Sequence, residues 1–224
     1  FELAPVFEEL NLACDHNMLV MEVLRQTAER YGFVCLMHEK PFAGINGSGK
    51  HVNWSVSTDA GENLFSPGRT PAENTRFLLF LAAFLKGVDE YSELLRSAAA
   101  YAGNDNRLGG QEAPPAIISV FVGSDLEALI DSLIRGETYS GQGSAPLAVG
   151  RDVLLQLGRD NTDRNRTSPM AFTGNKFEFR MPGSSMSIAE ANVVINTIVA
   201  DVLMGFADEL EKAVDIRATV EQIV

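Results

Sequence analysis

Residues 38 to 57 read HEKPFAGINGSGKHVNWSVS, and the second half of this stretch predicts a β-strand. From His51 to Ser57 polar and apolar residues alternate, and a strand points alternate side chains to opposite faces. One face would carry His51, Asn53, Ser55 and Ser57, and the other Val52, Trp54 and Val56. The pattern therefore predicts a sheet with one polar face and one buried face.

The glycine-rich segment before this strand, GINGSGK at residues 44–50, fits the GxxxxGK pattern of phosphate-binding loops. The next residue is His51, where that motif needs Ser or Thr, and a strand follows where the motif opens a helix. The interpretation as a phosphate-binding loop of that type is therefore weak. Two interpretations stay open: a turn that brings backbone amides against a ligand, or an ordinary tight turn.

A second alternating segment, KFEFRM at residues 176–181, places Lys176, Glu178 and Arg180 on one face. An imidazole, a carboxylate and cations on two strands could together bind a divalent metal and anionic oxygens. The alternative is the solvated face of an antiparallel sheet, which each strand taken alone favours.

The composition limits the classes of partner. The 224 residues carry a net charge of −12, and 46% of them are hydrophobic, which is typical of a globular protein. Nucleic acids and anionic membranes recruit Lys and Arg, so we expect neither as a partner. We expect a cytoplasmic protein with two reduced cysteines, and the start at Phe1 suggests a fragment of a longer chain.

Helix and strand signals alternate along the chain, too irregularly for a doubly wound sheet. A helix is predicted from Asp15, as its cap, to Tyr31, and capping boxes at Thr70/Glu73 and Ser187/Glu190 predict two more helices, the last reaching about Lys212. Further helices are expected at 92–101 and 125–135, and further strands at 33–37, 116–122 and 175–181.

The phrase HEKPFAGINGSGKHVNWS, residues 38–55, resembles the KP…G-x-NGSG-x-H-x-x-x-S motif of glutamine synthetases in the wording of their type III branch. Four further blocks follow the family's order: Phe1–Pro5, Asn106–Leu108 with Glu112–Pro114, Arg164–Thr167 and Asn175–Ser185. The blocks span most of the chain, and five in order make the resemblance specific.

This resemblance implies an α+β fold, in which a curved, mainly antiparallel sheet, part of the glutamine synthetase bifunnel, is flanked by helices. Residues 1–224 would be a partial catalytic domain truncated on its N-terminal side. Residues 115–163 would be a branch-specific insertion, and about 213–224 the start of a C-terminal helical region.

The resemblance also implies an activity, the ATP-driven ligation of ammonia to glutamate through γ-glutamyl phosphate. The family uses two or more Mg²⁺ or Mn²⁺ ions per site, and its members assemble into rings with sites shared between subunits. Glutamate, ammonium, ATP and further copies of the protein would therefore be the partners.

Individual site residues follow from the same motifs. For the metals, the resemblance implies Glu2 near glutamate, and His51 with Glu178 near the ATP phosphates. For catalysis it implies Arg107, Glu112 on a mobile flap that closes over the site, and Arg166 at the transferring phosphoryl group. For glutamate it implies Asn46, Gly47, Arg107 and Arg180, and for ATP it implies Asn53, Ser55, Arg166 and Lys176.

Some positions depart from the better-known type I pattern. Asn53 replaces a histidine, Lys176 replaces an arginine, and Ala171 stands near another arginine position. Two alternative functions therefore remain: a non-catalytic module that keeps the fold, and a ligase that joins glutamate to an amine other than ammonia. The retained His51, Glu178 and arginines speak against the first, and Glu112 favours ammonium over a bulkier amine.

Overall fold

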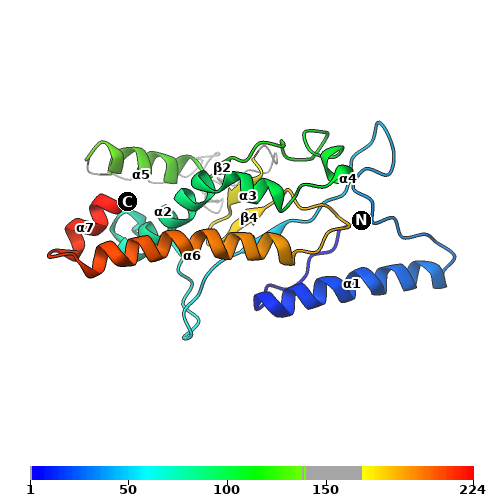
Figure 1. Cartoon of the computed structure of the whole chain (residues 1–224), viewed down its shortest axis with the longest axis horizontal. Helices are drawn as coiled ribbons and strands as arrows, with labels where there is room; N and C mark the ends of the chain where they lie inside the picture. Colours follow the sequence, from blue (N-terminus) through cyan, green and yellow to red (C-terminus); the bar gives the residue numbers. More distant parts are fainter. Residues whose placement is uncertain (1, 138, 140–167) are drawn as a thin grey trace, which may run out of the picture.

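The computed structural model describes residues 2–137, 139 and 168–224. Its helices are α1 (Leu10–Arg30), α2 (Thr75–Glu90), α3 (Ser92–Ser97), α4 (Ala102–Asp105), α5 (Ser124–Ile134), α6 (Ala189–Glu211) and α7 (Ile216–Ile223), with a 3₁₀ turn η1 at Pro71–Glu73. Its strands are β1 (Val52–Trp54), β2 (Val120–Phe121), β3 (Met170–Phe172) and β4 (Phe177–Phe179). Figure 1 shows the arrangement, with the long helix α6 running along most of the body.

The four strands form one sheet in the order β1-β4-β3-β2. β4 pairs antiparallel with both β1 and β3, and β2 pairs parallel with β3 at the edge. The predicted α+β class with a mainly antiparallel sheet is therefore confirmed. The strands are shorter than predicted, since β1 keeps three of the seven residues from 51 to 57 and β4 three of the seven from 175 to 181.

The apolar face of the sheet packs on the helices and forms the main core. Phe177 and Phe179 of β4 are fully buried, and Phe177 stacks on Phe84 of α2 with ring centroids 3.5 Å apart. Trp54 of β1 packs on the same Phe84 ring, and its indole N–H donates to Asn196 of α6 at 2.8 Å. Burying these aromatic rings is a large hydrophobic gain, and it fixes which face of the sheet remains for polar groups.

Helix starts differ from the sequence prediction. α1 begins at Leu10, because the Glu9 carboxylate accepts the N–H groups of Asn11 and Leu12, so the predicted cap Asp15 lies inside the helix. α2 begins after Asn74, whose side chain caps Phe77, and the predicted capping box at 70–73 forms only the short turn η1. Carboxylate and amide oxygens cap as well as hydroxyls, so several candidate starts compete.

The segment after α1 also differs. Residues 33–38 are irregular, and Phe33 and Val34 are 71% and 81% exposed, so the strand predicted at 33–37 is wrong. Apolar residues alone do not make a strand, because its backbone groups need a pairing partner. The expected end of α6 near Lys212 and the expected helix at 125–135 are confirmed.

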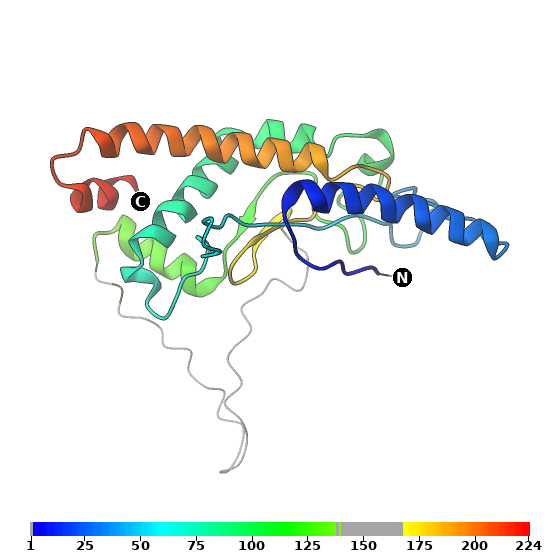
Figure 2. The same ribbon diagram turned by 90° about the horizontal axis from the view of Figure 1, so that it is seen from below.

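Figures 1 and 2 show α1 and α7 near opposite ends of α6. Between residues 115 and 163, the described part supplies β2 to the sheet and Leu126 and Leu129 of α5 to the core, whereas residues 140–163 lie outside the described part. α7 packs against α2 and α6. Within the described residues, no helix combines the length and apolar character that a membrane crossing requires.

Candidate active site

Three of the expected site residues meet on the polar side of β1 and β4. The Glu178 carboxylate contacts His51 Nδ1 at 2.9 Å through one oxygen and accepts from Arg180 Nε at 2.7 Å through the other. His51 comes immediately before β1, and Arg180 immediately after β4, so the antiparallel pairing of the two strands brings them together. Two residues separated by 127 positions in sequence thus share one hydrogen bond.

The cluster keeps its carboxylate ionised. Burial raises the pKa of Glu178, but hydrogen bonds from His51 and Arg180 and their charges outweigh it and lower the pKa from 4.5 to about 2. The Arg180 side chain is 5% exposed, and that of Glu178 16%. A partly buried carboxylate that stays charged at neutral pH is a suitable ligand for a hard divalent cation.

Neighbouring strands extend this polar row. Asn53 of β1 and Ala171 of β3 flank Glu178 in register, one on each side. Asn53 is exposed, as the alternation predicts, and Ser55, just after β1, and Lys176, just before β4, are half-buried. The small side chain of Ala171 is fully buried beside Glu178.

A second contact joins the glycine-rich loop to the expected flap. Asn46 donates its side-chain N–H to the Glu112 carboxylate at 2.6 Å. Glu112 has a φ of 56°, a left-handed backbone conformation that is uncommon outside glycine and concentrates at functional sites. The loop around it closes through a bond from the Gly109 N–H to the Pro114 carbonyl at 2.8 Å. The two residues that the motifs assign to glutamate and to ammonium therefore touch.

Arg107 lies under this loop and is only 4% exposed. Its guanidinium donates to the Asn104 side chain at 3.1 Å and to the carbonyls of Arg180, Met181 and Pro182 at 3.2, 3.0 and 3.4 Å. A Cβ added at Gly49 would lie 2.0 Å from an Arg107 nitrogen, so a larger residue there would displace the guanidinium. Arg107 thus fixes the chain just after Glu178, and its contact with glutamate stays a prediction.

Lys50, between the loop and β1, is held in a half-buried position. Its ammonium donates to Asn17 Oδ1 at 3.3 Å, to the Met186 carbonyl and to Met21 of α1. Burial lowers the pKa of Lys50 to about 8, and the nearby Glu39 carboxylate opposes this shift. Lys50 therefore ties α1 to the loop that precedes His51.

The donors present suit a metal ion only in part. An imidazole and an ionised carboxylate are typical ligands, and a metal-bound histidine commonly pairs its second ring nitrogen with a carboxylate. Among the residues that the structure describes, no three His, Cys, Asp or Glu side chains gather in one place. Glu2 is exposed at the beginning of the chain, and Arg166 lies outside the described residues.

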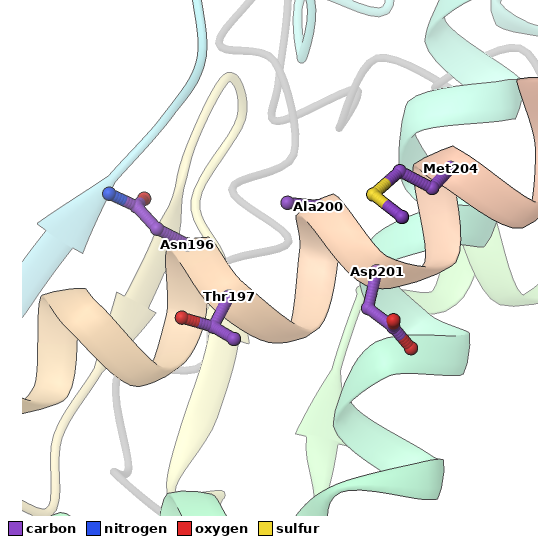
Figure 3. Close-up of a pocket in the computed structure, with 5 residues that line it drawn as sticks. All are labelled: Asn196, Thr197, Ala200, Asp201 and Met204. Atoms are coloured by element: carbon purple, nitrogen blue, oxygen red, sulfur yellow. The ribbon is translucent and has the colours of Figure 1, made fainter.

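A surface hollow elsewhere is unrelated to this cluster. Figure 3 shows its lining, which comes from one face of α6: Asn196, Thr197, Ala200, Asp201 and Met204. It shares no residue with the polar row on the sheet.

Comparisons with known proteins point to one family. The model of the glutamine synthetase catalytic domain matches residues 1–114, just over half of the chain. The chain belongs to the glutamine synthetase catalytic-domain family. It is 51% identical over 210 residues to a type-3 glutamine synthetase of Dictyostelium discoideum, covering 94% of this chain and 29% of that protein. It is 49% identical over 222 residues to a glutamine synthetase of Bacteroides fragilis, covering 96% of this chain and 30% of that protein.

A solved structure of GmaS without ligand shares the fold, with a TM-score of 0.54 at 18% identity, over 93% of this chain and 35% of that one. The chain therefore spans less than a third of the length of these two relatives and about a third of this structure. The resemblance to the type III branch, first drawn from five short motifs, is thus confirmed across most of the chain.

Sequence reasoning missed several polar residues beside the expected site. Glu39 and Asn104 are fully buried, and Ser185 donates to Glu39. Each sits within or next to a recognised motif, yet a single sequence does not distinguish a buried polar residue in a loop from a solvated one. The one available signal was the glycines in the same motifs, such as Gly47 and Gly183, because glycines mark places where other groups approach the backbone closely.

Proposed function

We propose that the full-length protein containing this chain is a glutamine synthetase, ligating ammonia to glutamate at the expense of ATP. The observation that supports it most is the His51–Glu178–Arg180 cluster beside the glycine-rich loop, in a chain about half identical to glutamine synthetases. The proposal extends to Mg²⁺ or Mn²⁺ as cofactor, a ring of subunits and a cytoplasmic location.

In this proposal, His51 and Glu178 hold a divalent cation. Such a cation would neutralise phosphate oxygens while the phosphoryl group moves. Arg180 and His51 keep the carboxylate ionised and fixed, which limits the reorganisation needed when the site is loaded. Asn53 and Ser55 extend the same face toward the nucleotide, Lys176 adds a cation immediately before β4, and Arg166 would bind the transferring phosphoryl group.

The loop side binds the amino acid. Asn46 and Gly47 hold the amino end of glutamate, and Arg180 and Arg107 hold its carboxylate groups. Glu112, already in contact with Asn46, places a negative charge where ammonium would bind. Closure of this loop excludes water, which would otherwise hydrolyse an acyl phosphate.

The reaction balances in two steps. A γ-carboxylate oxygen of glutamate attacks the terminal phosphorus of ATP, and ADP leaves. The ammonia nitrogen then attacks the γ-carbon, inorganic phosphate leaves with the former carboxylate oxygen, and the nitrogen loses a proton. The protein positions the reactants and stabilises charge, and needs no covalent intermediate of its own.

The test is phosphate release from ATP by the full-length protein with Mg²⁺, with glutamate and ammonium supplied separately and together. We expect release only when both are present, and loss of release in Glu178→Ala. Glu62→Ala is the matched control, because Glu62 also pairs with an arginine at 2.7 Å but at the surface. If phosphate release requires a bulkier amine, that amine and not ammonium is the substrate. A folded, metal-replete protein that releases no phosphate would refute the proposal.

A further inference from the structure

Glu39 is a fully buried carboxylate in the loop that leads to the candidate site. Its Oε1 accepts two hydrogen bonds from Ser185, from the backbone N–H at 2.8 Å and from the hydroxyl at 2.6 Å. Among the described atoms, its Oε2 makes no hydrogen bond. Removing a carboxylate from water is costly, so a buried one is retained only where its contacts offset the cost.

Two loops close tightly on this residue. A Cβ on Gly47 would lie 2.4 Å from the Glu39 carbonyl oxygen, and a Cβ on Gly183 would lie 2.4 Å from Glu39 Oε1. Nonbonded Cβ contacts this short are essentially never seen, so a larger residue at Gly47 would push the loop away from the Glu39 backbone, and one at Gly183 would displace the Glu39 carboxylate. The backbone of Glu39 therefore touches the substrate loop, and its side chain touches the turn after β4.

Backbone bonds join the same two segments. The Ser48 N–H donates to the Glu39 carbonyl at 2.7 Å, and the Lys50 N–H donates to the Pro182 carbonyl at 2.8 Å. Gly49 and Gly183 form an antiparallel bridge. The loop at 46–50 is thus fastened to the turn at 182–185, with Glu39 linked to both.

We propose that Glu39 is a positioning residue for glutamate binding, which rests on the function proposed above. By accepting both Ser185 bonds, it holds the Asn46–Gly49 loop in register with the turn that follows Arg180. The loop amides and the Arg180 guanidinium then face the same substrate. What matters is an acceptor oxygen at this position, so Gln can replace Glu and Ala cannot.

The kinetic test uses the full-length protein and four variants: Glu39→Ala, Glu39→Gln, Ser185→Ala and, as a control for an exposed carboxylate, Glu90→Ala. In Glu39→Ala we expect the KM for glutamate to rise about tenfold while the KM for ATP and kcat stay within about twofold, since the loop is misplaced but the chemistry is kept. Glu39→Gln should recover glutamate binding to within about threefold of wild type. Ser185→Ala should shift the same KM in the same direction by a smaller factor, because it removes only the hydroxyl bond. Adding it to Glu39→Ala should change little, because Glu39→Ala already removes that bond.

Hydrogen exchange gives a readout that does not require turnover. Amides at 46–50 and 182–186 should exchange faster in Glu39→Ala and at wild-type rates in Glu90→Ala. If Glu39→Ala fails to fold, the Ser185→Ala variant carries both measurements.

Active Glu39→Ala and Ser185→Ala variants with an unchanged KM for glutamate would overturn the inference. A loss of activity confined to kcat would also overturn it, and so would unchanged hydrogen exchange at 46–50 and 182–186. A wild-type protein that is inactive would instead refute the proposed function. Exchange would then decide separately whether Glu39 holds the two segments together.

Discussion

Two carboxylates that each contact an arginine at 2.7 Å, Glu178 in a partly buried cluster with His51, and Glu62 at the surface, allow the contribution of the cluster to be measured. Glu178–Arg180 and Glu62–Arg76 are both 2.7 Å apart, but the first pair is 16% and 5% exposed and the second 64% and 56%. We compare Glu178→Gln with Glu62→Gln. Glutamine keeps the size of the side chain and one acceptor oxygen, so each variant removes mainly the charge.

The expected magnitude follows from the pKa of Glu178. A pKa lowered from 4.5 to about 2 corresponds to about 3 kcal/mol in favour of the ionised form, reduced to about 2–3 kcal/mol by partial exposure. The exposed pair is worth about 0–1 kcal/mol. For a cooperatively unfolding unit of the length of this chain, each kcal/mol lowers Tm by roughly 2–4 °C. Glu178→Gln should therefore lower Tm by about 4–12 °C, and Glu62→Gln by less than about 4 °C.

The assay is thermal unfolding of the full-length protein and both variants in metal-free buffer, so that bound cations do not contribute. Because the folded-state pKa of Glu178 is depressed, its contribution is present above pH 4.5 and is lost as the pH falls toward 2. The gap between wild type and Glu178→Gln should therefore narrow below pH 4.5. Equal shifts in the two variants at neutral pH would refute the argument that the His51–Glu178–Arg180 cluster stabilises the fold more than a surface ion pair does.

Three further predictions concern other parts of the chain. Gly47→Ala should raise the KM for glutamate at least about tenfold in steady-state assays, because its Cβ would lie 2.4 Å from the Glu39 carbonyl oxygen. Gly205→Ala, on α6 with open space around it, should leave activity unchanged. Phe84→Leu should cost about 1–3 kcal/mol in thermal unfolding through loss of its stacked ring contact and of ring volume. The hydrogen bond and charge of Asp201 raise the pKa of Tyr91 above its usual value of 10. The contact therefore stabilises the fold below pH 10, and this stabilisation is lost as the pH rises through the pKa of the folded state. Asp201→Asn should lower the titration midpoint of one tyrosine, measured by ultraviolet absorbance.

Local pattern was enough to predict the faces of the sheet. Alternation placed Val52 and Trp54 in the core and Asn53 on the polar side, because the period of a strand depends only on its own backbone. Helix starts were less predictable, since Glu9 and Asn74 compete with Asp15 and Thr70 as caps and tertiary packing decides among them.

The site required information that no local pattern holds. The contact between His51 and Glu178 depends on the pairing of β1 with β4, and the motifs supplied it only through resemblance to a family. Glu39 was missed because its role depends on Ser185, which lies 146 positions away. Long-range pairing is set by the packing of the whole sheet, which single-sequence reasoning does not compute.

The two faces of β4 connect the stability of the fold to the geometry of the site. Phe177 and Phe179 are fully buried, and Glu178 between them points to the polar side, so we expect a shift of the aromatic core to move the carboxylate. The centroid of the Phe84 ring lies 3.5 Å from that of Phe177, and Phe177 directly precedes Glu178 in the chain, so a single residue connects Phe84 to the carboxylate. Phe84→Leu should therefore weaken metal binding as well as lower Tm. Phe42→Leu, at a residue that is 56% exposed, should do neither. A Phe84→Leu protein that is less stable but binds Mn²⁺ with unchanged affinity would show that β4 holds the carboxylate independently of the core beneath it.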